Sequence, residues 1–143
     1  MKKISMFAML LLLCLTLIAA FPAYADNGSD YQSIQPRWTE ASIFPCSITR
    51  KDGLFTNAHV LCSVTTYSSY SKIELTVTIQ EKSGSDFVDT SHTWFFSGNG
   101  YAGGTKDLKL SSGTYRVKGV AVIYSSSGQY IETVTNYSSD IVI

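Results

Sequence analysis

Apolar and polar residues alternate along most of the chain after about its fortieth residue, with a period of two rather than the 3.6 of a helix. In the string IELTVTIQ, for example, Ile73, Leu75, Val77 and Ile79 share one side of an extended chain, and polar residues share the other. This pattern is typical of a strand in a sheet with one buried and one wet face. Val, Ile, Thr, Tyr and Phe, which favour strands, dominate the same region.

Turn-forming clusters rich in Ser, Gly, Asp and Asn divide this region into segments of strand length. The predicted strands are 42–50, 57–65, 72–80, 87–97, 105–110, 114–124 and 130–137. Short strands at this spacing predict an all-β fold, a single antiparallel β-sandwich of about seven strands of the immunoglobulin-like type. A small barrel is the alternative.

The first 25 residues follow a different pattern. Two lysines precede an apolar run over residues 4–20, and the string AYA at 23–25 places small residues on both sides of one arbitrary position. This is the layout of a secretory signal peptide, and the run is shorter than the ~20 residues that a membrane span needs. We therefore expect a secreted protein without stable membrane insertion after cleavage. Its predicted parts are a signal peptide (1–25), an N-terminal extension (26–41) and a β-sandwich domain (42–143).

The charge balance limits the classes of partner. The 143 residues include eleven basic and eleven acidic side chains, and removal of the leader takes two lysines, which leaves nine against eleven and a formal charge of −2. Because no basic stripe remains to follow a phosphate backbone, we expect no nucleic-acid partner. Only two histidines occur, and we expect neither a metal site nor a cofactor.

Cys46 and Cys62 are the cysteines that remain after the leader. In an oxidising compartment, a disulfide is the expected state of such a pair. Alternation places Cys46 on the same inward side as Phe44, and Cys62 on the same side as Val60. If the first two strands pair as a hairpin, the cysteines face one another. The disulfide then closes a loop in the unfolded chain, and this restriction stabilises the fold by roughly 3 kcal/mol.

The string TNAHV at 56–60 resembles the segment that carries the catalytic histidine in trypsin-like proteases. Such a protease also needs a serine nucleophile, usually in a GDSGG-like turn, and a second barrel. No GDSGG-like string occurs, and alternation turns His59 outward because Ala58 and Val60 turn inward. We therefore predict no enzymatic activity and no catalytic residue. For the remote alternative of a small or degenerate hydrolase, the candidate acids are Asp86 and Asp89, and the candidate nucleophiles are Ser111, Ser112, Ser126 and Ser127.

Several segments together resemble a family of small secreted proteins of Gram-positive bacteria that is known chiefly as a domain of unknown function. They are IQPRWT at 34–39, AHVLCSV at 58–64, IELTVTIQEKSG at 73–84, HTWFF at 92–96, LSSGTYRVKGVAVIY at 110–124 and ETVTNYS at 132–138. The resemblance spans nearly all of the region after the leader. It implies a β-sandwich and assigns no catalytic or binding residues.

Three other aromatic residues are predicted to be structural. Tyr115 enters a strand just after Gly113, where a tyrosine hydroxyl often bonds nearby backbone and fixes the corner between two sheets. Trp94 and Phe96 alternate on one side of their strand and are expected in the core or as a cover of the sheet.

Tyrosines in predicted loops are the remaining candidates for a binding site. Tyr67 and Tyr70 lie in YSSYS, and Tyr101 lies in the glycine-rich string NGYAGG. Loops on a rigid scaffold commonly carry binding residues. We therefore predict a non-catalytic extracellular binding module with an unidentified protein or glycan partner, and a carbohydrate-binding module is the alternative.

We expect the mature chain to begin at Asp26, because the small side chains of Ala23 and Ala25 suit signal peptidase. N-terminal sequencing of the protein recovered from culture medium checks the cleavage site. A mature protein that still carries the apolar run would contradict both the cleavage site and the expected oxidising compartment.

Overall fold

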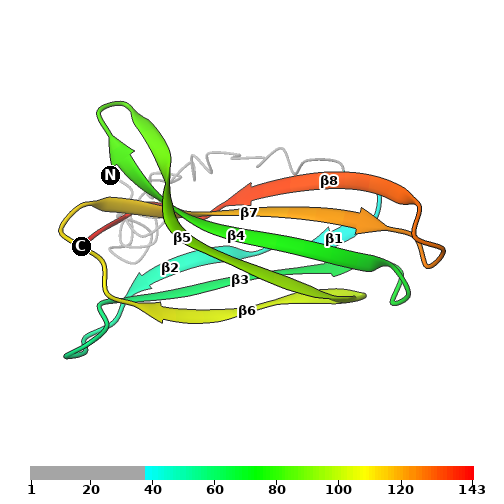
Figure 1. Cartoon of the computed structure of the whole chain (residues 1–143), viewed down its shortest axis with the longest axis horizontal. Coiled ribbons are helices and arrows are strands. Elements are labelled where there is room, and N and C mark those ends of the chain that lie inside the picture. The colour runs from blue at the N-terminus through cyan, green and yellow to red at the C-terminus, as the bar shows by residue number, and fades with distance from the viewer. Residues whose placement is uncertain (1–37) are drawn as a thin grey trace, which may run out of the picture. The chain divides into compact units, whose positions relative to one another are not determined.

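The computed structural model describes residues 38–143, which contain strands and no helix. No helix in this part of the chain is therefore long and apolar enough to cross a membrane. The predicted signal peptide and most of the predicted N-terminal extension lie outside the described residues. The strands are β1 (Ala41–Ile43), β2 (Cys46–Arg50), β3 (Ala58–Thr66), β4 (Lys72–Ser83), β5 (Asp86–Asn99), β6 (Tyr101–Leu108), β7 (Thr114–Tyr124), β8 (Tyr130–Tyr137) and β9 (Ile141–Val142) (Figure 1).

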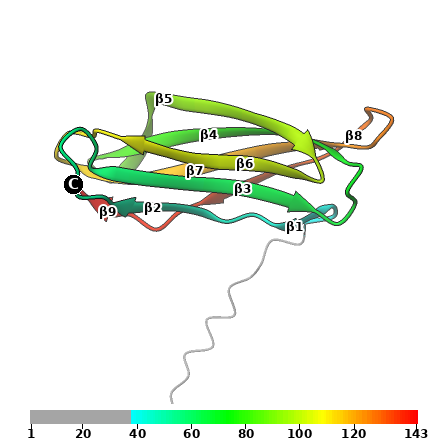
Figure 2. The ribbon, with the colours of Figure 1, turned by 90° about the horizontal axis from the view of Figure 1, so that it is seen from below.

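The strands form two antiparallel sheets that lie face to face (Figure 2). In sheet A, β3 pairs with β6 along one edge and with β1 and β2 along the other. In sheet B the order is β5-β4-β7-β8, and β9 also pairs with β7. A three-stranded sheet, β2-β3-β6, thus faces a four-stranded one. This confirms the predicted immunoglobulin-like sandwich of about seven principal strands, to which β1 and β9 add three and two residues.

Strand alternation accounts for the core between the sheets. The inward residues predicted for β3 and β4 are all at most 2 % exposed, which confirms the prediction. They are Ala58, Val60, Cys62, Val64, Ile73, Leu75, Val77 and Ile79. Gln80 is predicted to be outward, but it is buried because the Asp89 and Arg116 side chains to which it hydrogen-bonds lie beside it on the outer face of sheet B.

Cys46 and Cys62 form the predicted disulfide between β2 and β3. The two residues are direct cross-strand partners, with Cα atoms 4.2 Å apart. The sulfur atoms lie against Gly119 of β7, where an added Cβ would be 2.7 Å from each of them and 2.9 Å from the ring of Phe44. The missing side chain of Gly119 therefore provides the space in sheet B that the disulfide of sheet A occupies.

Two strands differ most from their predicted bounds. The segment predicted as one strand over 42–50 is divided into β1 and β2 at Pro45, because proline has no N–H to donate to a ladder. The strand predicted to begin at residue 105 begins at Tyr101. Gly103 and Gly104, which suggested a loop, lie within β6 and allow close approach: a Cβ on Gly104 would be 2.7 Å from the ring of Phe96.

Of the three aromatic residues predicted to be structural, Trp94 and Phe96 lie as expected and Tyr115 differs in its hydrogen-bond partner. Trp94 and Phe96 are partly buried and pack against the core, which confirms their expected role. Tyr115 is buried, but its hydroxyl donates to Oε1 of Glu81 at 3.1 Å rather than to backbone. Tyr115 and Glu81 are ladder partners, so this bond lies within sheet B and does not join the two sheets. Burial, together with the bond to Glu81, raises the pKa of Tyr115.

We expect Gly119→Ala to lower the free energy of unfolding by about 1–3 kcal/mol, because the added methyl group overlaps both sulfur atoms. The cost should be smaller in the Cys46→Ala/Cys62→Ala background, where the sulfur atoms are gone. Urea unfolding of the four proteins gives the coupling as a double-mutant cycle. An equal cost in both backgrounds would show that the disulfide and Gly119 do not constrain each other.

Candidate functional site

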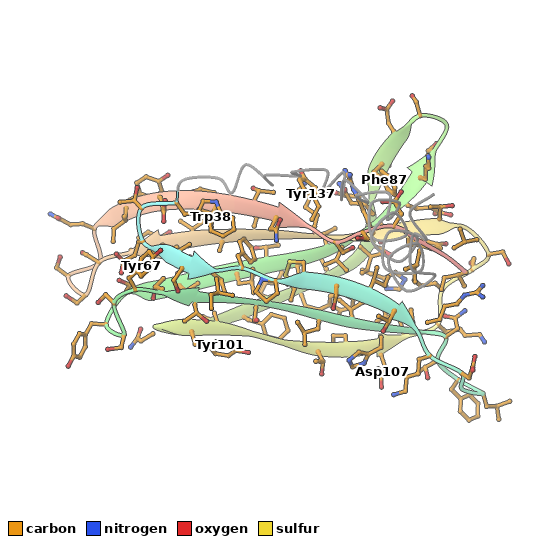
Figure 3. All side chains as sticks on the ribbon, turned by 180° about the vertical axis from the view of Figure 1, so that it is seen from behind. Trp38, Tyr67, Phe87, Tyr101, Asp107 and Tyr137 are labelled. Carbon is orange, nitrogen blue, oxygen red and sulfur yellow. A yellow bond between two sulfur atoms is a disulfide. The ribbon has the colours of Figure 1, made fainter. Side chains whose placement is uncertain are left out.

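The three candidate binding tyrosines lie at one end of the sandwich, where Figure 3 labels Tyr67 and Tyr101. Tyr67 and Tyr70 belong to the loop between β3 and β4, and Tyr101 is the first residue of β6, opposite Thr65 near the end of β3. The prediction that Tyr101 lies in a loop is wrong, but its side chain is 53 % exposed, and those of Tyr67 and Tyr70 are 73 % and 76 % exposed.

Backbone hydrogen bonds join the loop of Tyr67 and Tyr70 to the turn before Tyr101. The N–H of Thr66 donates to the carbonyl of Gly100 at 3.0 Å, and the N–H of Gly100 donates to the carbonyl of Ser71 at 2.9 Å. Gly100 has a φ of +70°, a conformation that glycine adopts without strain. The loop and the turn are therefore one hydrogen-bonded unit.

The hairpin between β7 and β8 adds two tyrosines to the same end. Tyr124 pairs with Lys72, the first residue of β4, and the Lys72 Nζ lies 5.6 Å from the centroid of the Tyr124 ring. The Tyr130 ring meets that of Tyr124 edge to face, with centroids 6.4 Å apart. Alternation does not single these residues out, and the available sequence signal is a pair of tyrosines that flanks SSSGQ. We call Tyr67, Tyr70, Tyr101, Tyr124 and Tyr130 the tyrosine end.

A carboxylate on β8 holds the chain that leads into β1. Glu132 accepts hydrogen bonds from the backbone N–H groups of Thr39, Glu40 and Ala41 at 2.9, 2.7 and 2.9 Å. Burial raises the pKa of Glu132, but the three N–H donors together outweigh this effect and hold its pKa below the ordinary value. The ionised form of Glu132 therefore fastens this segment to sheet B.

Glu40, which Glu132 holds, in turn fixes the loop of the tyrosine end. Its carboxylate oxygen Oε1 accepts from the N–H of Ser68 at 3.0 Å and from the hydroxyl of Ser71 at 2.7 Å. Its carbonyl accepts from the N–H of Tyr67 at 2.9 Å. The exposed tyrosines thus lie on a loop with fixed backbone, although their rings are open to solvent.

His59 lies half-exposed on the outer side of β3, as predicted, and its partner differs from the candidates named from the sequence. His59 Nδ1 lies 2.6 Å from Oδ1 of Asp107 on β6, and Lys51 binds the same carboxylate. Asp86 and Asp89 both belong to β5 in the other sheet. The hydrogen bond from Lys51, and next that from His59, lowers the pKa of Asp107. The cluster is therefore an ion-paired group on the surface of sheet A.

Among the described residues, His59 makes no hydrogen bond to a serine that could act as a nucleophile. Within residues 38–143, its one side-chain hydrogen bond is to Asp107, and no group of three or more His, Cys, Asp and Glu residues there is arranged to bind a metal ion. Asn57 of TNAHV joins two loops, since its amide donates to the carbonyl of Leu110 and accepts from its N–H, both at 2.8 Å. The four candidate serines lie outside the strands, Ser111 and Ser112 between β6 and β7, Ser126 and Ser127 between β7 and β8.

No protein-family model matches the chain, and no curated protein matches it. Among solved structures, it is similar to the crystal structure of a GH3 β-glucosidase from Bifidobacterium adolescentis, with 17 % sequence identity and a TM-score of 0.29. The likeness covers 68 % of this chain and 17 % of the β-glucosidase.

We expect Glu132→Gln to lower the melting temperature at neutral pH and to weaken its dependence on acid. The pKa of Glu132 in the folded protein is below the ordinary 4.5, so its contribution is complete above that value and is lost as the pH falls through the folded pKa. Melting curves between about pH 7 and pH 3 measure this. The variant should lose less stability over this range than the wild type.

The matched control is Asp140→Asn, which removes an exposed carboxylate without a hydrogen bond to residues 38–143. It should leave both the melting temperature and its acid dependence close to those of the wild type. Asp89 and Asp107 also have lowered pKa values, so some acid dependence remains in the Glu132 variant. An unchanged dependence after Glu132→Gln would contradict the assigned role of its carboxylate.

Proposed function

We propose that this protein is a secreted, non-catalytic binding domain that meets an extracellular protein through its tyrosine end. The observation that carries the proposal is the position of two Ser/Tyr-rich connections at one end of an immunoglobulin-like sandwich. Secretion is supported by the leader pattern and by the disulfide, which oxidising compartments favour. The resemblance to small secreted proteins of Gram-positive bacteria supports the same location.

The sheet order identifies these connections. In an immunoglobulin-like sandwich, strands A, B and E lie in one sheet and C, F and G in the other. The order β2-β3-β6 matches A-B-E, and β4-β7-β8 matches C-F-G. The loop between β3 and β4 is thus a B–C loop and the turn between β7 and β8 an F–G loop. In antibody variable domains, loops at these positions contact antigen, and such loops are rich in Tyr, Ser and Gly.

The composition and the exposed area of the tyrosine end fit this use. The B–C loop contains YSSYS, and the F–G turn SSSGQ lies between Tyr124 and Tyr130. A buried aromatic side chain contributes roughly 200 Å². At 53–76 % exposure, the rings of Tyr67, Tyr70, Tyr101 and Tyr130 together supply on the order of 500 Å². This exceeds half of the ~800 Å² that each partner buries in a standard interface.

The hydrogen bonds beneath the loop favour binding as well. Glu40 fixes the backbone between Tyr67 and Ser71 before any partner arrives. Less conformational entropy is then lost on association, which is the usual advantage of a preorganised loop. The tyrosine rings, which have few rotatable bonds, add contact area at low entropic cost.

A carbohydrate is the second candidate partner. The rings of Tyr67 and Tyr70 are the most exposed of the tyrosine end, and each presents a flat apolar face with a polar hydroxyl. Both properties suit a sugar ring as well as a protein surface. A glycan array probed with the wild-type protein and with Tyr67→Ala distinguishes the two classes of partner.

Site-specific photo-crosslinking tests the proposed surface. A benzophenone amino acid at position 70 should crosslink to a protein on the surface or in the medium of the native cells, and mass spectrometry then identifies that protein. With the purified partner, Tyr67→Ala and Tyr101→Ala should each weaken binding at least tenfold, about 1.4 kcal/mol, as truncation of an aromatic anchor does.

Phe55 provides the control. It is 81 % exposed in the loop between β2 and β3, at the end of β3 remote from the tyrosine end. A crosslinker at position 55 should not capture the same protein, and Phe55→Ala should bind as the wild type does. Equal capture from both positions, or full affinity in both tyrosine variants, would contradict the proposal. A signal on the glycan array that Tyr67→Ala abolishes would assign the surface to carbohydrate.

A further inference from the structure

The outer face of sheet B holds a guanidinium group between two aromatic rings. The Cζ of Arg116 on β7 lies 4.1 Å from the ring centroid of Phe87 on β5 and 4.4 Å from that of Tyr137 on β8. Figure 3 shows Phe87 and Tyr137 toward the opposite end from Tyr67. Rings at these distances attract the cation and restrict its orientation. Arg116 is therefore held in place and is distinct from the tyrosine end.

Polar contacts fix one edge of this guanidinium and leave the other edge unused. The Nε of Arg116 donates to Oε1 of Gln80 at 2.7 Å, and Nε2 of Gln80 donates to Oδ1 of Asp89 at 2.6 Å. The other oxygen of Asp89 accepts from Nζ of Lys118 at 3.2 Å. Asp89 is thus paired with Gln80 and Lys118 rather than with Arg116. Within residues 38–143, Nη1 and Nη2 of Arg116 donate to no acceptor.

Within the described part of the chain, these two nitrogens remain available for a further contact. Arg116 is half-buried, and neither Nη1 nor Nη2 has an acceptor in residues 38–143. A guanidinium presents its Nη atoms as a planar fork, which matches the two oxygens of a carboxylate.

The charge around Arg116 favours an anion. Nζ of Lys82 lies 6.0 Å from the ring centroid of Phe87, on which Arg116 also stacks, and Lys118 binds the carboxylate of Asp89. Glu81, next to Lys82, lies on the other face of sheet B, where it accepts the hydroxyl of buried Tyr115. This patch is positive in a chain with no net formal charge.

The surface beside Arg116 is open and bears hydroxyl groups. Along β7 it continues over Lys118 to Val120, which is about 13 Å from Arg116 by the rise of a strand. Val120 pairs with Thr76 of β4, and Thr76 pairs with Phe95 of β5. The ring of Phe95 is 77 % exposed and borders a shallow groove of about 380 Å³. Threonines lie on the same face of sheet B. Thr133 and Thr135 are exposed and Thr76 is half-buried, while buried Thr78 bonds its hydroxyl to that of Thr93.

We propose that this face binds an acidic oligosaccharide, with a sugar carboxylate on the Nη atoms of Arg116 and a further sugar ring against Phe95. The guanidinium supplies the charge and the planar fork, and Lys118 adds a second cation beside it. A saccharide is favoured over a peptide because the face offers the hydroxyl groups of Thr76, Thr133 and Thr135 and the exposed flat ring of Phe95. Neither Arg116 nor Phe95 belongs to the tyrosine end, so this site is independent of the function proposed above.

Titration of the mature protein with tri-galacturonate, followed by amide NMR, tests the proposal. The methyl-esterified trimer is the matched ligand without the charge. The acidic trimer should shift the amides of residues 116–118 and 93–96, and the ester should bind at least tenfold more weakly. Arg116→Lys keeps the charge but removes the fork, and it should weaken binding of the acidic trimer at least tenfold. Lys109→Gln removes an exposed cation between β6 and β7 and should leave binding unchanged.

Phe95→Ala is the second variant, because its exposed ring is not part of the core and its removal should leave the melting temperature unchanged. It should weaken binding of the acidic trimer severalfold. Absence of binding, equal binding of acid and ester, or full affinity in both variants would overturn the proposal. A tripeptide with a free C-terminus that binds through Arg116 more tightly than the sugar, and loses binding as its amide, would overturn the assignment to a saccharide.

Discussion

The contact between the Cys46–Cys62 disulfide and Gly119 sets the geometry on which the rest of the domain depends. The disulfide joins direct partners in β2 and β3 and thereby fixes their register, and a slip by one residue would turn every side chain of a strand to the opposite face. Gly119 lets the two sulfur atoms approach β7, so the same group also sets how closely the sheets pack at this point. The inward cysteines and the outward His59 follow from one register.

Carboxylates have different roles at the two ends of the sandwich. Glu132 binds three backbone N–H groups and Glu40 binds the B–C loop, so charge is used to shape backbone beneath the exposed tyrosines. Asp107 at the other end binds the side chains of Lys51 and His59 and is thereby neutralised on the surface. The first arrangement fixes the backbone of a loop, whereas the second satisfies its own groups and resembles a surface ion-pair cluster of small energetic value.

The alternation of apolar and polar residues made the core predictable, because the inward or outward direction of a side chain in a strand can be read from its sequence neighbours alone. It placed Cys46 and Cys62 inward and His59 outward, as the structure shows, and the turn composition located Tyr67 and Tyr70 in an exposed loop. It missed contacts between residues far apart in sequence. Asp107 lies 48 positions from its partner His59, and Glu132 lies more than 90 from the N–H groups that it binds. Tyr101 was misplaced because glycines that serve close packing in β6 have the composition of a loop.

The two candidate surfaces and the His59 cluster differ in whether their polar groups are already satisfied. On sheet A, Lys51 forms an ion pair with the carboxylate of Asp107, and His59 hydrogen-bonds to the same carboxylate. On sheet B, Asp89 is paired with Lys118, while the Nη atoms of Arg116 retain donors that residues 38–143 do not use. Stacking between Phe87 and Tyr137 holds that guanidinium without neutralising it. A held but unneutralised cation is the arrangement that favours an external anion, because its orientation is fixed before binding and its charge remains to be matched.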